Sequence, residues 1–229
     1  MDFEIILKSI PRLLDGMWVT LALTSITVVL GLLLAVPLAI VRTSGPAWLN
    51  APIFAYTFFF RGTPLLVQLY LIYYGSGQFR AELEAIGLWW FFRDPWNCAL
   101  LAFTLSTTAY TTEIIRGAIL AVPTEQREAA LAYGMTGFTR LRLIILPQAF
   151  AFAIPAYINE IVFQLQATAL VSLITIEDIT GNATLIANRT YHHYELYLTA
   201  AVIYLVLVYA LLLALKQVEK RLTRHIAPA

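Results

Sequence analysis

Cysteine is almost absent from this sequence, since Cys98 is the only one among 229 residues. A single cysteine excludes an internal disulfide bond and a cysteine metal cluster. Charged residues are also scarce: they form 13% of the chain, against about 25% in an average soluble domain. The formal net charge is only +1, so the sequence gives no reason to expect a nucleic-acid partner.

Two motifs of catalysis are missing as well. The sequence contains no Gly-rich phosphate-binding loop ending in Gly-Lys-Ser/Thr and no His-Glu-X-X-His metal motif. The adjacent His192 and His193 fall in a polar stretch, which is more typical of a solvated loop than of a metal site. We therefore expect a chain that is not an enzyme, holds no metal and carries no cofactor of its own.

Long apolar runs are what the sequence has instead. Hydrophobic residues make up 60% of the chain, and its mean hydropathy is +0.74. A membrane-spanning helix needs about 20 predominantly apolar residues. We therefore expect an all-α membrane protein that forms a single transmembrane domain over residues 1–229. Its five predicted spans cover about 18–40, 53–74, 97–121, 148–173 and 197–215.

The basic residues predict how these spans are oriented. With five spans the termini lie on opposite sides, and cytoplasmic loops carry an excess of lysine and arginine. We therefore expect an external N-terminus and a cytoplasmic C-terminus. The side with fewer basic residues holds Lys8, Arg12, Arg80, Arg93 and Arg189. The richer side holds Arg42, Arg116, Arg127, Arg140, Arg142, Lys216, Lys220, Arg221 and Arg224.

The polar loop over residues 123–147 has the pattern of two short helices. Thr124 can cap the first helix, and Gly134 tolerates the left-handed backbone that ends a helix. Thr136 can start a second helix, which Pro147 separates from the next span. We therefore expect a compact helix–turn–helix on the cytoplasmic side, shaped to dock into the groove of a partner.

Glu160 is the only charged residue in the fourth predicted span. A carboxylate within the membrane is energetically unfavourable unless it pairs with a cation or contacts water, and such a residue commonly marks a transport path. Glu160 would then attract a cationic substrate, with Asn159, Gln164 and Thr168 as polar neighbours. Two structural alternatives stay open. Glu160 can pair with Arg61 across helices, or it can stay protonated and be held by Asn159 or Gln164.

Three further ionisable residues lie in or near the predicted spans. Arg61 stands beside Gly62 and Pro64, where a broken helix and a cation can line a path. Its long side chain can equally extend to the membrane surface. Glu113 and Arg116 are three residues apart, so we expect them to pair on one helix face.

The loop also carries a family motif. Glu128-Ala129-Ala130 is followed by Gly134 and then by Ile144-X-Leu146-Pro147. This spacing resembles the loop that marks the membrane subunits of bacterial binding-protein-dependent ABC importers. Phe60–Leu65 and Arg116–Ile119 resemble the polar amino acid branch of that family. The stretches most similar to the M subunits of the histidine/lysine/arginine/ornithine and opine permeases are Ala109–Ile114, Ala132–Gly134 and Pro155–Glu160.

The resemblance implies a type I ABC importer permease in the bacterial inner membrane. It implies four kinds of partner besides the lipid bilayer: a second homologous membrane permease subunit, two ATPase subunits that bind ATP, a periplasmic substrate-binding protein and an amino acid substrate. The expected substrates are polar, basic amino acids or opines, and a heterodimer of membrane subunits is favoured. The residues that would couple to the ATPase are Glu128, Ala129, Ala130 and Gly134. Glu128 can contact the ATPase directly or stabilise the start of its own helix.

Two other classes of function are open to a chain of this composition. An ion-coupled secondary amino acid transporter would favour more spans, internal repeats and several ionisable groups within the membrane. The helix–turn–helix loop would then have no explanation. An intramembrane enzyme would need a nucleophile–base pair, and none stands out in the sequence.

Overall fold

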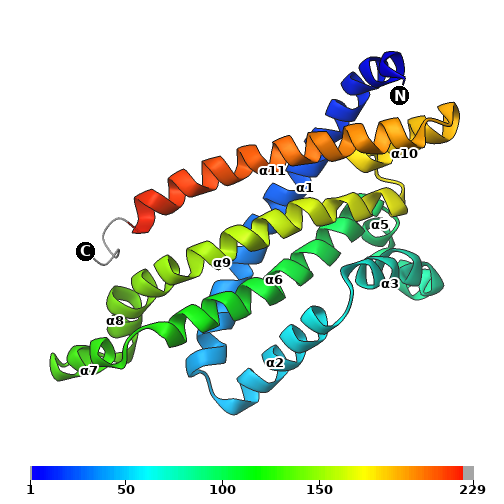
Figure 1. Ribbon diagram of the computed structural model, residues 1–229. Coiled ribbons are helices and arrows are strands. Elements are labelled where there is room, and N and C mark those ends of the chain that lie inside the picture. The colour runs from blue at the N-terminus through cyan, green and yellow to red at the C-terminus, as the bar shows by residue number, and fades with distance from the viewer. Residues whose placement is uncertain (1, 224–229) are drawn as a thin grey trace.

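The computed structural model describes residues 2–223, and every regular element among them is a helix. Arg224, counted above among the basic residues, lies outside the described residues. Figure 1 shows long helices side by side, with α1 crossing behind α6 and α9. In chain order the elements are α1 (Phe3–Ser44), α2 (Ala47–Gly62), α3 (Leu65–Gln78), α4 (Arg80–Ala85), α5 (Trp89–Phe92), α6 (Pro95–Ala121), α7 (Thr124–Ala132), α8 (Gly137–Arg140), η1 (Leu141–Ile145), α9 (Leu146–Ala167), η2 (Thr168–Ile174), α10 (Ile179–Thr190) and α11 (His193–Thr223).

Four helical segments of the described chain are long and apolar enough to cross a membrane: Phe3–Ser44, Pro95–Ala121, Gly137–Ile174 and His193–Arg221. They contain the first, third, fourth and fifth predicted spans. The first is longer than predicted, because α1 has 42 residues and so extends about 63 Å. Asp2 starts it by accepting a hydrogen bond from the backbone N–H of Glu4 at 3.0 Å.

The second predicted span is not one helix. It consists of α2, with 16 residues, and α3, with 14 residues, which meet at Thr63 and Pro64. Pro64 has no N–H and restricts Thr63 to the extended backbone seen there. The buried Gln68 amide donates to the carbonyl oxygens of Phe60 at 2.8 Å and Thr63 at 3.0 Å, two acceptors that the break exposes. The predicted count of five spans is therefore not confirmed, since only four helical segments of the described chain are long and apolar enough to cross a membrane on their own.

Small residues bring α1 close to its neighbours. A Cβ atom on Gly31 would overlap the side chain of Thr107 on α6. A Cβ atom on Gly16 would lie 2.5 Å from the backbone of Asp178. Close backbone approach at small residues is how helices pack where lipid removes the hydrophobic driving force. Glycine at these two positions therefore fixes α1 against α6 and against the start of α10.

The loop after α6 forms the predicted helix–turn–helix, here called the knob (α7, α8 and the turn between them). It projects at the end of the bundle toward which α11 runs (Figure 1). Two details of the prediction were wrong. Thr124 lies inside α7 and Pro123 occupies the cap position, so no side chain caps this helix. Pro147 comes just after the π-helical turn η1, and α8 runs through η1 into α9 without a break, so Pro147 does not separate α8 from the span.

Candidate functional site

A pocket of about 340 Å³ opens where the break between α2 and α3 faces the middle of α6 and the second half of α9. We call it the Glu160 pocket. The broken helix supplies Thr63 to its wall because the chain leaves helical geometry there. The residues that line the pocket are Thr63, Leu65, Ser106, Tyr110, Glu160, Phe163, Gln164 and Ala167.

Glu160 is the only acidic residue in this lining. Its carboxyl group lies beside Thr107 on α6 and within the electrostatic influence of Arg61. The exposed Arg61 places its guanidinium carbon 5.6 Å from the ring centre of Tyr110, which itself lines the pocket. An acid and a base on different helices thus approach the same pocket, and no direct ion pair between them is present among the described contacts.

The other predicted substrate-binding residues divide into two groups. Gln164 lines the pocket and donates to the hydroxyl oxygen of Thr27 on α1 at 2.9 Å. Asn159 and Thr168 are absent from the lining. Asn159 directly precedes Glu160, and its side chain is exposed on another face of the helix. Thr168 is fully buried, and its hydroxyl group donates to the carbonyl oxygen of Leu165 at 2.7 Å. The structure therefore brings together Glu160 and Gln164, with Arg61 at the edge.

The knob presents the predicted coupling residues on a short, tight hairpin. Glu128 and Ala129 are exposed, whereas Ala130 is buried. Gly134 has a φ angle of +72°, which confirms the left-handed turn predicted there. Thr136 begins α8 and accepts a hydrogen bond from the backbone N–H of Thr139, as predicted.

The knob is also tied to the end of the third span. The guanidinium group of Arg127 on α7 donates to the carbonyl oxygen of Ile119, in the last turn of α6. The same carbonyl oxygen also accepts a hydrogen bond from the backbone N–H of Val122 at 3.4 Å, so Arg127 adds a side-chain contact to a helix end that the backbone already closes. The knob is therefore hydrogen-bonded to α6 as well as joined to it through the chain.

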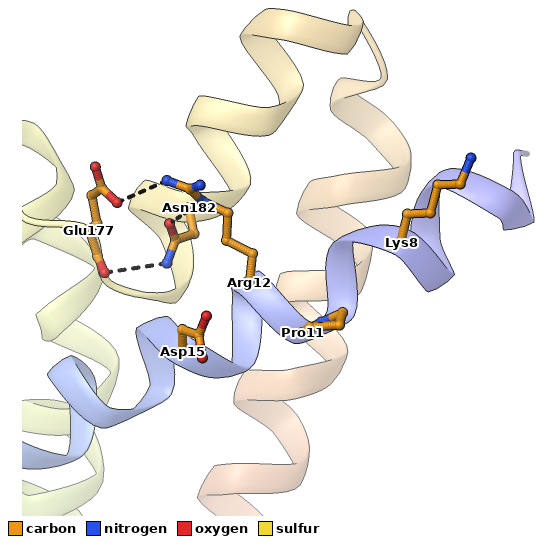
Figure 2. Close-up of a pocket in the computed structure, with 6 residues that line it drawn as sticks. All are labelled: Lys8, Pro11, Arg12, Asp15, Glu177 and Asn182. Carbon is orange, nitrogen blue, oxygen red and sulfur yellow. Dashed lines mark hydrogen bonds and ion pairs between the residues drawn. The ribbon is translucent and has the colours of Figure 1, made fainter.

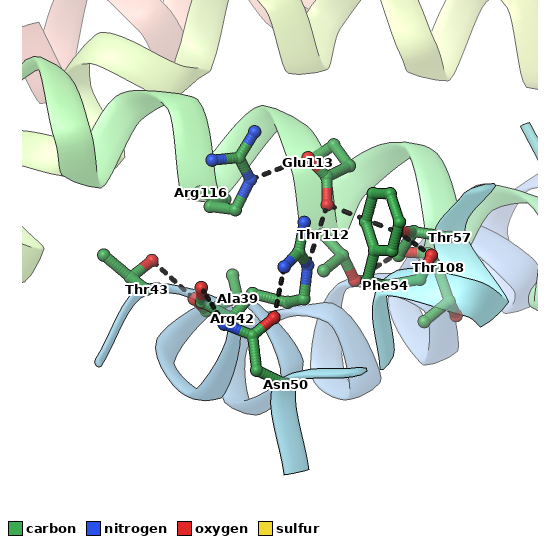
Figure 3. A network of polar contacts seen from close by, with 10 residues as sticks. All are labelled: Ala39, Arg42, Thr43, Asn50, Phe54, Thr57, Thr108, Thr112, Glu113 and Arg116. Carbon is green, nitrogen blue, oxygen red and sulfur yellow. Dashed lines mark hydrogen bonds and ion pairs between the residues drawn. The ribbon is translucent and has the colours of Figure 1, made fainter. Parts of the chain in front are cut away.

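A buried polar network joins α1, α2 and α6 near this end of the bundle (Figure 3). Glu113 is its centre: it receives hydrogen bonds from Arg116 at 2.7 Å, from Arg42 at 3.3 Å and from Thr57 at 3.3 Å. Arg42 also donates to the side chain of Asn50. The predicted pair of Glu113 with Arg116 is confirmed, but the sequence did not predict Arg42. Its position at the end of a predicted span was the only available signal.

A second polar cluster lies at the opposite end of the bundle (Figure 2). Arg12 on α1 pairs with Glu177 at 3.1 Å and donates to the side chain of Asn182 on α10 at 3.2 Å. Asp15 and Lys8 line the same opening of about 500 Å³. Both partners of the ion pair are about half exposed, at 48% and 56%, so water weakens the attraction between them.

Comparison with known proteins identifies the family. Residues 27–224 match the model of the binding-protein-dependent transport system inner membrane components. The chain therefore belongs to this family. The permease is 44% identical to the nopaline transport system permease protein NocM of Agrobacterium fabrum, over 91% of this chain and 87% of the relative. It is 43% identical to the histidine/lysine/arginine/ornithine transport system permease protein HisM of Escherichia coli, over 93% of this chain and 90% of the relative.

Solved structures agree with this assignment. The permease superposes on a crystal structure of an amino acid ABC transporter with histidines with a TM-score of 0.85 and 34% identity, covering 96% of this chain and 99% of that one. A chain of the MetNI methionine ABC transporter shares the fold, with a TM-score of 0.76 at 20% identity. The predicted fold class, a type I ABC importer permease, is confirmed. These matches do not support the ion-coupled alternative.

Proposed function

We propose that this permease forms half of the path of an importer for basic amino acids or opines. The observation that carries the proposal is the Glu160 pocket, where a carboxyl group stands among polar and aromatic side chains at a helix break. A cationic side chain such as that of arginine, lysine or ornithine would be attracted by Glu160. The named substrates of the relatives HisM and NocM are consistent with this chemistry.

Arg61 extends the proposal to the other end of the substrate. Every amino acid carries a carboxylate, and arginine is suited to bind carboxylates through two parallel hydrogen bonds. Because Arg61 approaches the edge of the pocket that holds Glu160, the two residues would select a molecule with a cation at one end and an anion at the other. Gln164 would complete the polar wall.

The remaining components would be separate chains. In our proposal the knob docks into an ATPase subunit, because the sequence has no phosphate-binding loop of its own. A second homologous permease subunit, which we expect to differ in sequence, would close the path, and a periplasmic binding protein would deliver the substrate. The knob and the C-terminus would face the cytoplasm of a bacterial cell and the N-terminus the periplasm.

Reconstitution of the complete transporter in vesicles tests this function. ATP hydrolysis and uptake are measured with binding protein loaded with arginine, lysine, ornithine, histidine, nopaline or octopine, and with glutamate and methionine as controls. We expect stimulation by cationic amino acids or opines only. Equal stimulation by glutamate, or uptake driven by an ion gradient without ATP, would contradict the proposal.

A further inference from the structure

Tyr110 on α6 holds Arg61 at the edge of the Glu160 pocket through two contacts. Its ring centre lies 5.6 Å from the guanidinium carbon of Arg61, and its hydroxyl group donates to the backbone carbonyl oxygen of Arg61 at 3.4 Å. Tyr110 also lines the pocket, and 36% of it is exposed. A guanidinium group therefore already lies on an aromatic wall of the pocket.

The carboxyl group of Glu160 approaches the same stretch of α6. It lies beside Thr107, and Thr107 and Tyr110 are three residues apart, which places them on one face of the helix. An aromatic ring and a carboxyl group thus border the same space. This combination suits a cation, because the face of an aromatic ring is electrostatically negative and an ionised carboxyl group adds a full opposite charge.

Little else holds the side chain of Arg61. It is exposed, and among the described contacts its guanidinium group makes no hydrogen bond and no ion pair. Arg42 and Arg116, in contrast, both donate to Glu113. A cation over an aromatic ring at an exposed position is held weakly, so a competing cation in the pocket can displace Arg61 from Tyr110.

We infer that Tyr110 makes the pocket select guanidinium groups over ammonium groups, and that Arg61 covers its ring until the substrate enters. This inference rests on the proposed function. The arriving substrate would draw Arg61 to its carboxylate, and its own guanidinium group would take the vacated ring, with Glu160 supplying the opposite charge. A guanidinium group is planar, stacks on aromatic rings and is more weakly hydrated than an ammonium group. The favoured substrates are therefore amino acids that carry a guanidinium group, such as arginine, ahead of lysine and ornithine.

A comparison of arginine with lysine tests the role of Tyr110. The two substrates have the same charge and the same carboxylate, so the charges of Glu160 and Arg61 do not distinguish them. Uptake by the reconstituted transporter is measured below saturation with each loaded binding protein. Each rate is divided by that of the wild type, so that the preference of the binding protein cancels. Tyr110→Leu removes the ring and should lower uptake of arginine about tenfold and uptake of lysine by no more than about threefold. Tyr110→Phe keeps the ring and should leave both rates near those of the wild type.

Tyr70→Leu is the matched control. Tyr70 is also 36% exposed, but its ring lies 5.4 Å from that of Tyr74 and it is absent from the lining of the pocket. This variant should keep the wild-type ratio of arginine to lysine uptake. An equal loss of both substrates in Tyr110→Leu, or an equally large loss in Tyr110→Phe, would overturn the inference and leave the proposed function intact. If the wild type takes up neither substrate, the proposed function fails and the inference fails with it.

Agmatine, which is arginine without its carboxylate, tests the displacement of Arg61. Its affinity for the purified complex in detergent is measured by calorimetric titration. Arg61→Gln should strengthen agmatine binding about fivefold because the ring is vacated, and it should weaken arginine binding because the carboxylate loses its partner. In a Tyr110→Leu background the gain for agmatine should be smaller, since only the repulsion between two cations is then removed.

Two results would contradict the displacement. The first is an equal gain for agmatine in both backgrounds, because it would show that Arg61 does not compete for the ring. The second is unchanged or weaker binding of agmatine by Arg61→Gln alone, which decides the question even if Tyr110→Leu does not assemble.

Discussion

The Nε atom of Arg42 lies 3.3 Å from the Oε1 atom of Glu113, and this contact joins the end of α1 to α6. Both side chains are only 11% exposed. The same carboxylate binds Arg116 at 2.7 Å, so one largely buried acid serves two bases, of which Arg116 is partly exposed. Thr57 and Asn50 extend the network to α2, so it holds α1, α2 and α6 together in the half of α6 that leads into the knob.

Removing the charge of Glu113 is expected to destabilise the permease. Glu113→Gln leaves two arginines without their counter-charge, and breaking a buried pair in this way costs about 3–5 kcal/mol. The measurement is the melting temperature of the purified complex. Glu84→Gln is the control, because Glu84 and Arg80 form an exposed pair at 2.8 Å that is worth about 0–1 kcal/mol. Equal melting temperatures for the two variants would refute a stabilising role for Glu113.

The turn of the knob is expected to be essential for coupling. Gly134 has a φ angle of +72° with open space around it, so Gly134→Val would meet no clash but would strain the backbone by about 1–2 kcal/mol. We expect the spans to insert and the ATPase to lose its response to substrate. Gly137→Val is a matched control, since Gly137 also faces open space but has no left-handed backbone. Normal transport by Gly134→Val would show that the knob is not the coupling element.

Glu160 is expected to determine the charge of the substrate. Glu160→Gln keeps the shape of the side chain and removes the attraction for a cation, so uptake of arginine and lysine should fall while the complex still assembles. The readouts are uptake into vesicles and the yield of intact complex. Glu84→Gln, outside the pocket, should behave as the wild type does. Unimpaired uptake of arginine by Glu160→Gln would exclude the proposed role.

Labelling with a membrane-impermeant thiol reagent tests the orientation. In a Cys98→Ala background, a cysteine at Gln126 on the knob should resist the reagent in intact cells. Cysteines at Glu84 and Asn188 should react, because both positions are exposed and lie in segments expected on the outer side. The opposite pattern would reverse the orientation and remove the basis for docking at the knob.

Asp178 should make stability depend on pH. Burial raises the pKa of its carboxyl group, although Asp178 accepts hydrogen bonds from the backbone N–H of Gly181 and the hydroxyl group of Tyr204. A raised pKa means that the fold favours the protonated acid. Its stabilising contribution is therefore complete below the ordinary pKa of about 3.9 and is lost as the pH rises through the raised value. The melting temperature of the wild type relative to Asp178→Asn should fall over that range, and a difference that does not change with pH would contradict this.

Most of the membrane fold could be predicted from local sequence. Uncharged runs of about 20 residues leave little choice but a spanning helix, because backbone groups must find partners within the segment. Gly134 and Thr136 predicted the knob because the preferences of these residues for turns and helix caps are also local properties of the sequence. The break in the second span was visible in Gly62 and Pro64. Its stabilisation by Gln68 was not, because that depends on how the two half-helices are placed.

The sites were harder to predict because their residues are distant in sequence. Arg42 and Glu113 are 71 residues apart, and only the crossing of α1 and α6 brings them together. Glu160 was singled out by its isolation in an apolar run, which is a local property. Asn159 is adjacent to Glu160, but a helix turns about 100° per residue, so the two side chains face different surroundings. Thr168 lies where α9 has given way to η2, and its hydroxyl group donates to the carbonyl oxygen of Leu165.

The helix α11 stands apart from most of the core. Only 6% of its most apolar stretch is buried inside the described chain. Two of the three buried clusters draw no residue from it among those described: one joins α1, α6, η1 and α9, and the other joins α1, α3, α6 and η2. Every described residue of these two clusters precedes α11 in the chain, so both clusters can pack before α11 docks. The last helix then has only one buried cluster to close, against α1 and α10, before the finished subunit meets its partners.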